Sequence, residues 1–205
     1  MEAFWKSGYA GTSLDDLAAA TGMNRPSLYA AFGDKRALYF KALRSYWRMS
    51  AAEMRDVFAA ERPLRESLTD FYDRALSIYY GGVKGRPRGC FSVSTATTEA
   101  AEDPEIRAAL AESVRRLDST LETAIRAARD RGEIGPDADP SALAVLGAGT
   151  LHTIAIRARA GAPRGDLEAL ARKAVKVICG AMGPAATSET GLTPVPSPAS
   201  GDREP

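Results

Sequence analysis

The sequence has few of the residues that build catalytic and metal sites. Its 205 residues include one histidine, His152, and two cysteines, Cys90 and Cys179. The cysteines lie far apart and show no metal-ligand spacing such as C-x-x-C. No Gly-rich phosphate loop, Ser/His/Asp order or carboxylate-plus-histidine cluster occurs. We therefore predict a protein that is not an enzyme, has no metal site and no cofactor, and works in the reducing cytoplasm.

Long apolar runs and a strong charge of one sign are also missing. We find no run of about 18 apolar residues and no charged-then-apolar leader, so neither a membrane span nor a secretory signal is expected. The formal net charge is +1, so any nucleic-acid surface must be local. Residues 1–48 carry seven basic and four acidic side chains, a modest positive excess at this end.

Strand signals are scarce as well, whereas Ala, Leu, Glu and Arg recur at helical spacing. This pattern predicts an all-α fold of about nine helices. Beyond the first 33 residues, helices are expected over 34–60, 63–80, 90–101, 104–131, 140–160 and 164–182. From residue 183 the sequence is rich in Pro, Ser, Thr and Gly, which predicts a disordered tail over 183–205.

Residues 12–35, TSLDDLAAATGMNRPSLYAAFGDK, predict two short helices joined by a tight turn. Ser13 and Asp16 resemble a capping pair at the start of the first helix. Gly22 tolerates a left-handed backbone in the turn, and Asn24 suits the cap of the second helix. This is the helix-turn-helix pattern, in which the front of the second helix meets base edges in the major groove. An ordinary α-hairpin is the alternative.

The motifs of this segment resemble the DNA-binding region of the TetR family of bacterial transcriptional regulators. They are the G-Y-x-G-T-S lead-in, the A-x-x-x-G turn, the x-L-Y-x-x-F helix and the following G-x-K, all within Gly8–Leu43. GCFSVSTATTEAAEDPEIRAAL, residues 89–110, resembles a segment found in many members. The resemblance implies an N-terminal helix-turn-helix DNA-binding domain over 1–46 and a C-terminal helical ligand-binding and dimerisation domain over 47–182.

The chain departs from the family pattern in its first helix. Only residues 1–7 precede the motif, whereas the family's first helix is usually longer. We expect a missing turn to leave Leu17 and Phe32 less well covered. Either the true start codon lies upstream, or the DNA-binding domain is marginally stable.

The resemblance implies DNA contacts of two kinds. Phosphates would be held by Thr12, Ser13, Tyr29 and Lys35. Bases would be faced by Arg25, Pro26, Ser27 and Ala30, with Asn24 serving as both cap and contact. Arg25 is the best candidate to recognise guanine, because its planar fork can bond O6 and N7 together. Tyr29 is alternatively a half-buried core aromatic.

The last two helices are suited to pairing with a second copy of the chain. ALAVLGAGTLHTIAI combines large apolar residues with glycines that permit close helix approach: Leu143, Leu146, Leu151 and Ile154 with Gly147 and Gly149. The final helix carries an apolar stripe of Leu167, Leu170, Ala171, Ala174, Val175 and Ile178. The family builds a four-helix dimer interface from this pair. The alternative is that these faces complete the core of a single chain.

Residues between the two ends could line an apolar effector pocket with a few polar groups. The candidates are Phe71, Tyr72, Ile78, Tyr79, Cys90, Phe91, Leu110, Leu117, Leu121 and His152. Each is alternatively plain core. In the family, an effector bound there reorients the DNA-binding domains and releases the operator.

Cys90 follows three basic residues, Lys84, Arg86 and Arg88, and lies near a predicted helix start. Nearby cations and a helix N-terminus both favour a thiolate. A redox or electrophile sensor or a soft-metal ligand is therefore one interpretation, and a plain buried cysteine is the other.

The sequence thus predicts a ligand-responsive transcriptional regulator that is cytoplasmic. The expected form is a homodimeric repressor that binds a palindromic double-stranded operator and is released by a small-molecule effector. The alternative is a redox- or ligand-sensing helical protein whose DNA binding is weakened or lost.

Overall fold

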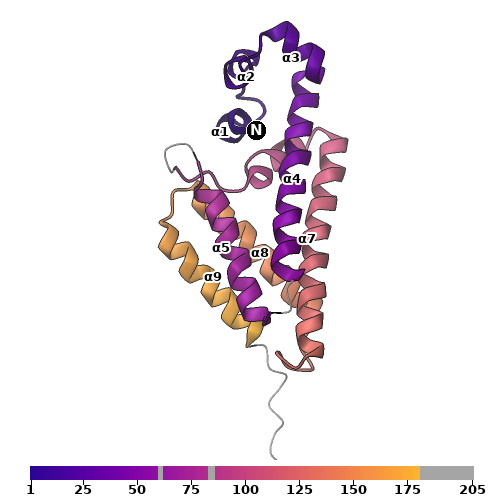
Figure 1. Ribbon diagram of the computed structural model, residues 1–205, viewed down its shortest axis with the longest axis vertical. Helices are drawn as coiled ribbons and strands as arrows, with labels where there is room; N and C mark the ends of the chain where they lie inside the picture. The colour runs from indigo at the N-terminus through magenta and orange to yellow at the C-terminus, as the bar shows by residue number, and fades with distance from the viewer. Residues whose placement is uncertain (60–61, 83–85, 181–205) are drawn as a thin grey trace, which may run out of the picture.

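The computed structural model describes residues 1–59, 62–82 and 86–180, which contain helices and no strand (Figure 1). The elements are α1 (Glu2–Ser7), α2 (Leu14–Thr21), α3 (Arg25–Phe32), α4 (Lys35–Ala59), α5 (Leu64–Tyr80), the π-helix η2 (Ser92–Ala96), α6 (Thr97–Glu99), α7 (Pro104–Asp130), α8 (Pro140–Arg159) and α9 (Arg164–Cys179). The all-α fold class is confirmed for this part of the chain. The predicted tail over 183–205, the predicted helix ends at Ala60 and Met182, and Lys84 lie outside the described residues.

The helices form two groups along the long axis of the molecule (Figure 1). The N-terminal unit consists of α1, α2 and α3 around the first part of α4. The helical bundle consists of α5, α7, α8 and α9, and the second part of α4 packs against α5 and α7. Because α4 belongs to both groups, it connects them directly.

Three long helices begin at a capping aspartate. The carboxylates of Asp34, Asp103 and Asp139 accept backbone N–H groups from the first turns of α4, α7 and α8 at 2.7–3.3 Å. Pro104 and Pro140 follow two of these caps, in the first turn where no backbone N–H is required. The predicted starts of these three helices are confirmed.

The expectation of an ordinary helix over 90–101 is wrong in its geometry. Ser92–Ala96 forms a π-helical turn that leads into the short α6. Thr95 Oγ1 donates a hydrogen bond to the Phe91 carbonyl at 2.8 Å, and Thr97 Oγ1 donates to the Val93 carbonyl at 3.0 Å. Such hydroxyls compete for helix carbonyls and favour local distortion.

The short α1 covers the helix-turn-helix better than expected. It buries Phe4 and Trp5, and Leu17 is only 4% exposed, while Phe32 is half-buried. The Phe4 ring packs edge-on against Tyr39, with 5.1 Å between ring centroids. The predicted loss of cover at Leu17 is therefore wrong.

α8 is relevant to the expectation that the chain has no membrane span. It is the one helix in the described part of the chain whose length and mean hydropathy, 1.3, would allow this. In the structure, α8 packs against α5, α7 and α9 as a member of the helical bundle. One third of its apolar window is buried within the chain, so much of its apolar surface lies outside the bundle.

Candidate functional site

α2, the first helix of the helix-turn-helix, begins with a capping box. The Asp16 N–H donates to Ser13 Oγ at 3.1 Å, and the Ser13 N–H donates to Asp16 Oδ2 at 2.8 Å. Ser13 Oγ also donates to this carboxylate at 2.6 Å. The two hydrogen bonds from Ser13 lower the pKa of Asp16. The predicted cap is confirmed, and it already engages the Ser13 groups expected to contact phosphate.

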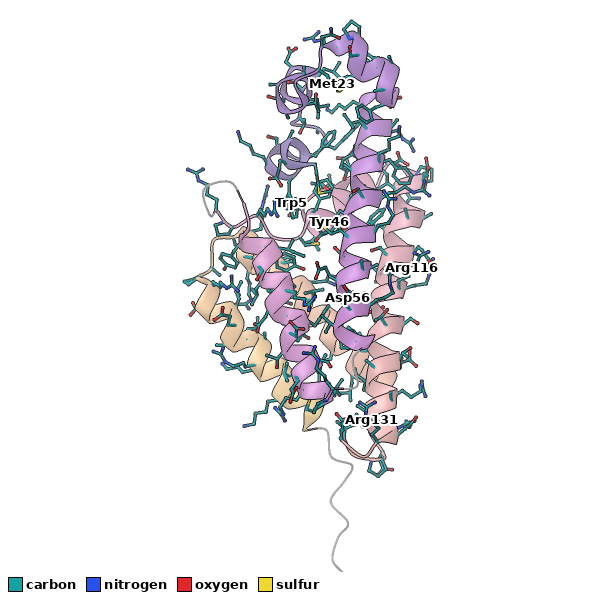
Figure 2. The ribbon with its side chains drawn as sticks, in the orientation of Figure 1. Trp5, Met23, Tyr46, Asp56, Arg116 and Arg131 are labelled. Atoms are coloured by element: carbon teal, nitrogen blue, oxygen red, sulfur yellow. The ribbon has the colours of Figure 1, made fainter. Side chains whose placement is uncertain are left out.

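The turn between α2 and α3 is formed by Thr21, Gly22 and Met23. Gly22 has φ of +69°, a left-handed conformation that glycine adopts without a Cβ penalty. The Thr21 hydroxyl donates to the Leu17 carbonyl at 2.7 Å and closes the end of α2. Met23 is half-buried where α2 meets α3 (Figure 2). The turn thereby fixes the angle between the two helices.

α3 exposes almost its whole surface. Its cap, Asn24, accepts the Ser27 N–H on Oδ1 at 2.8 Å, and Pro26 lies in the first turn. Leu28 is the only fully buried residue of α3. The exposed residues include every predicted base contact, namely Arg25, Pro26, Ser27 and Ala30, and the two further predicted contacts Asn24 and Tyr29. The structure thus brings six of the nine predicted DNA contacts onto one short helix and its cap.

Tyr29 is 49% exposed, one of the large hydrophobic residues left open to solvent. This exposure argues against the interpretation of Tyr29 as a core aromatic. Arg25 lies one turn before Tyr29, so both side chains project from the same side of α3. A guanidinium and a phenol hydroxyl are suited to base edges and phosphates, respectively.

The Arg25 side chain forms a bidentate ion pair across the turn with Asp15 of α2. Arg25 Nε and Nη2 donate to Asp15 Oδ1 and Oδ2 at 2.8 and 2.6 Å. Both side chains are largely exposed, 56% for Arg25 and 73% for Asp15. The hydrogen bonds from Arg25 lower the pKa of Asp15. No sequence pattern indicates this pairing, although Asp15 stands beside the capping residue Asp16 and takes no part in the cap.

Two other predicted phosphate contacts differ in how far they are buried in the N-terminal unit. The Thr12 side chain is buried, and its hydroxyl donates to the Gly8 carbonyl at 2.6 Å. In this conformation the Thr12 hydroxyl is buried on the Gly8 carbonyl and is not open to a phosphate. Lys35 is half-buried, with its ammonium 4.5 Å from the centroid of the Tyr9 ring.

The N-terminal unit is joined to the helical bundle by a seam of aromatic and hydrogen-bonded contacts around Trp5. The Trp5 ring packs edge-on against Tyr46 at 5.3 Å between centroids, and Figure 2 shows the two residues together. Trp5 Nε1 donates to the Arg88 carbonyl at 3.1 Å, and the Arg88 guanidinium lies over the Trp5 ring. Arg88 also forms an ion pair with Glu2 of α1. The seam therefore ties α1 to the segment that precedes η2.

α8 reaches the same seam at its C-terminal end. Arg159 donates to the carbonyl oxygens of Trp5 and Lys6 at 3.0 and 3.3 Å, which are free at the end of α1. Gly89 has φ of +64°, and a Cβ there would lie 2.6 Å from the Ala155 carbonyl. Backbone therefore packs directly on α8, and any side chain at residue 89 would separate the two. Sequence patterns could not reveal contacts between residues this far apart in the chain.

The predicted effector-pocket residues fall into two packed groups. Phe91 lies against Trp5, and Tyr46 meets Cys90 with 3.2 Å between Oη and Sγ. In the second group the Tyr72 hydroxyl donates to the Gly147 carbonyl at 3.0 Å. Most of the predicted residues are buried: Phe71, Tyr72, Tyr79, Cys90, Phe91, Leu117 and Leu121; His152 is half-buried. Ligand binding by these residues stays a prediction.

Cys90 lies in the seam and is almost fully buried. The guanidinium of Arg88, one of the cations expected beside it, is directed instead to Trp5, Glu2 and the Ile78 carbonyl. These contacts engage the Arg88 guanidinium with groups other than the Cys90 sulfur. Cys179 is half-buried on α9, and burial raises the pKa of its thiol.

We expect the half-buried His152 to cause a small pH dependence of the free energy of unfolding. Burial lowers its pKa below 6.5, with Asp118 opposing the shift. Below about pH 6.5 the unfolded chain therefore binds a proton more readily than the folded chain, so stability falls as pH falls. We expect thermal melts from pH 7.5 to 5 to show a shallower loss in His152→Gln than in the unsubstituted protein, by at most about 1.4 kcal/mol per pH unit. Equal slopes in the two proteins would contradict this.

The α9 stripe expected at a dimer interface is largely buried within the chain. Leu167, Ala171, Val175 and Ile178 belong to the core, as do Leu151 and Ile154 of α8. The Cβ of a residue in place of Gly147 would lie 3.4 Å from Leu121 and 3.6 Å from Ile178. For these residues the single-chain core was the correct interpretation. Among the large residues predicted to pair, only Leu146 is exposed.

A hollow in the bundle, on the side away from the N-terminal unit, contains none of the predicted pocket residues. It has a volume of about 300 Å³ and is lined by Pro63, Leu64, Arg65, Glu66, Glu133, Ile134 and Cys179. Glu133 Oε2 accepts the Leu64 N–H at 2.6 Å and so caps α5. The hollow brings together the start of α5, the loop after α7 and the end of α9.

Comparisons with known sequences identify both parts of the fold. Residues 1–42 match the family described as "Bacterial regulatory proteins, tetR family", and residues 65–181 match "Tetracyclin repressor-like, C-terminal domain". The HTH-type transcriptional repressor ComR of Escherichia coli (strain K12) is 32% identical over 163 residues, covering 79% of this chain and 77% of ComR. The uncharacterized HTH-type transcriptional regulator YezE of Bacillus subtilis (strain 168) is 30% identical over 145 residues, covering 70% of this chain and 74% of YezE.

A solved structure agrees with these matches. A cysteine mutant of the TetR family transcriptional regulator CifR, complexed with 26-bp double-strand operator DNA, is 30% identical with a TM-score of 0.75. The similarity covers 85% of this chain and 91% of the CifR chain. The family match extends over more than half of the sequence and over both groups of helices. The chain therefore belongs to the TetR family of bacterial transcriptional regulators.

Proposed function

We propose that this protein is a repressor that binds a palindromic operator as a homodimer and leaves it when a small-molecule effector binds. The observation that carries the proposal is the exposure of α3, which contributes a single fully buried residue and leaves its polar front open. A helix with this exposure next to a capped partner helix is arranged as in other helix-turn-helix proteins. ComR is named a repressor, and CifR is solved with operator DNA.

The proposed DNA interface combines base and phosphate contacts. Arg25, Pro26, Ser27 and Ala30 would face bases, and Ser13, Asn24, Tyr29 and Lys35 would contact the DNA around them. We assign residues 1–46 to DNA binding and residues 47–182 to regulation and dimerisation. Tyr46, at this boundary, contacts both Trp5 and Cys90.

The proposed dimer interface is the outer face of α8 and α9. Val145 and Ile156 of α8 and Val177 of α9 are 59%, 57% and 57% exposed, and Leu146 is 43% exposed. On α8 these residues recur at helical spacing together with Gly149, whose missing side chain leaves open space. Exposed large apolar residues grouped on neighbouring helices are typical of an interface. Pairing would relate two copies of α3 by a two-fold axis, as the two halves of a palindromic operator are related.

The effector is proposed to act on the seam between the two groups of helices. Arg159, at the end of α8, holds the last carbonyls of α1. Gly89 packs directly on α8. A ligand that shifts α8 or the η2 segment would therefore change the position of α1 and of the helix-turn-helix beside it.

Selection of bound sequences from random duplex DNA tests this proposal most directly. We expect two inverted half-sites whose centres lie about one helical turn or a multiple of it apart, and protection of both in footprinting. Repeating the selection with candidate effectors and oxidants should identify the compound that releases the DNA. A monomeric protein that prefers no duplex at low salt would contradict the proposal and support the sensing alternative.

Salt dependence provides a separate prediction for Lys35. The logarithm of operator affinity should fall linearly with the logarithm of salt concentration. The slope of this plot should be about −0.9 for each phosphate neutralised. Lys35→Ala should reduce the slope by about 1 per protomer and leave the order of sequence preference unchanged. Fluorescence anisotropy at several salt concentrations measures both. An unchanged slope would exclude Lys35 as a phosphate contact.

A further inference from the structure

The ion pair between Asp15 and Arg25 joins the two helices of the helix-turn-helix at their front ends. Asp15 lies in the first turn of α2, and Arg25 is the first residue of α3. The two contacts of 2.8 and 2.6 Å are those of a bidentate pair, which fixes the plane of the guanidinium as well as its position. The side chain expected to recognise guanine is therefore held by its neighbour helix before DNA arrives.

Asp15 takes no part in the cap of α2, although its carboxylate in the first turn also suits the positive end of the helix. The cap of this helix is supplied by Ser13 and Asp16, which satisfy each other's backbone N–H groups. An acidic residue close to a DNA backbone would be repelled by phosphates. Its presence at this position is explained if the carboxylate acts on Arg25.

The geometry of the pair leaves part of the Arg25 fork free. A guanidinium carries five N–H donors in one plane: one on Nε and two on each Nη. Asp15 accepts from Nε and Nη2, along one edge of that plane. The end of the fork still carries N–H groups on Nη1 and Nη2, and this end can donate to guanine O6 and N7 together.

We propose that Asp15 is a positioning residue that orients Arg25 for guanine recognition, so that α2 contributes to sequence specificity without touching a base. The proposal rests on the proposed function and adds a residue to its recognition machinery. Because the ion pair already restricts the Arg25 side chain to one rotamer, binding guanine costs less conformational entropy. The same restriction keeps Arg25 from contacting phosphates or other bases.

The consequence is a change in discrimination and not only in affinity. Without the carboxylate, Arg25 can swing to other acceptors, so binding to other duplexes rises or is unchanged while the preference for guanine falls. A bidentate arginine–guanine contact discriminates by about 5- to 150-fold. We expect Asp15→Asn to lower the preference at that position by about tenfold, within this range. Because an exposed pair adds little to stability, the variant should remain folded.

The experiment compares affinities for the selected operator and for operators changed at the Arg25 position. The changes replace the guanine by adenine or by a deaza analogue that lacks N7. Asp15→Asn should discriminate between these operators about tenfold less than the unsubstituted protein does, and Arg25→Ala should not distinguish them. The double variant should behave as Arg25→Ala alone, because Asp15 acts through Arg25.

Asp16→Asn is the matched control, because it removes the same charge from the same turn of α2 and leaves the Arg25 pair in place. We expect it to change affinity for all duplexes by one common factor. If Asp15→Asn gives the same uniform change, or sharpens the preference for guanine, the positioning role is overturned. If Arg25→Ala keeps full discrimination, or the unsubstituted protein prefers no duplex, the DNA-contact assignment itself fails and the proposal with it.

Discussion

Replacing Arg25 with alanine is expected to abolish preference for the operator while the protein remains folded and dimeric. Arg25 is exposed at the front of α3 and has no contact that stabilises the core. Loss of a bidentate guanine contact costs about 1–3 kcal/mol, and a symmetric dimer loses it twice, hence roughly 2–6 kcal/mol. The measurement is the ratio of affinities for operator and unrelated duplex at one fixed salt concentration.

Arg116→Ala provides the control for this variant. Arg116 is an exposed arginine on α7, paired with Glu112 and far from α3 (Figure 2). Its removal changes the net charge by the same amount and should leave operator preference intact. Should Arg25→Ala discriminate as well as Arg116→Ala does, α3 would not read bases through its first residue.

Replacing Leu146 with glutamate is expected to dissociate the proposed dimer and, with it, to remove tight operator binding. Leu146 lies on the apolar outer face of α8, and two-fold symmetry would bury the new carboxylate twice. A charge placed in such an interface without a partner costs several kcal/mol, roughly 3 or more per copy. A single helix-turn-helix contacts too few bases to bind tightly alone. Light scattering during gel filtration measures the mass, and anisotropy measures DNA affinity.

Met49→Glu is the matched control for Leu146→Glu. Met49 is 42% exposed, close to the 43% of Leu146, but it belongs to α4 and not to α8 or α9, which form the proposed interface. The substitution places the same charge on an exposed apolar position and should leave the mass and DNA affinity unchanged. A Leu146→Glu protein that is still a dimer would assign the subunit contact to another surface.

Helix starts could be predicted well because their determinants are local. Ser13, Asn24, Asp103 and Asp139 each cap a helix through backbone groups two or three residues ahead. The π-helical turn in η2 escaped prediction, because an apolar and hydroxyl-rich segment fits an ordinary helix equally well.

The partner of each helix face could not be predicted from periodicity. Val175 and Ile178 of α9 recur at helical spacing, as do Val145 and Ile156 of α8. The first pair is buried within the chain and the second is exposed. Spacing identifies an apolar face and says nothing about which surface covers it. The candidate DNA contacts were identified through the family motif, whereas the Asp15–Arg25 pair depends on how α2 and α3 meet in space.

The hydrogen bonds from Arg159 to α1 would couple the DNA-binding unit to the subunit contact in a dimer. In the proposed dimer, α8 would contact the neighbouring subunit along its length, and its C-terminal residue Arg159 would hold α1. If α8 of one protomer shifted or rotated against α8 of the other, the distance between the two helix-turn-helix units would change. The major grooves of a DNA duplex recur at a fixed interval. A small displacement at the subunit contact would therefore prevent the second α3 from entering its major groove.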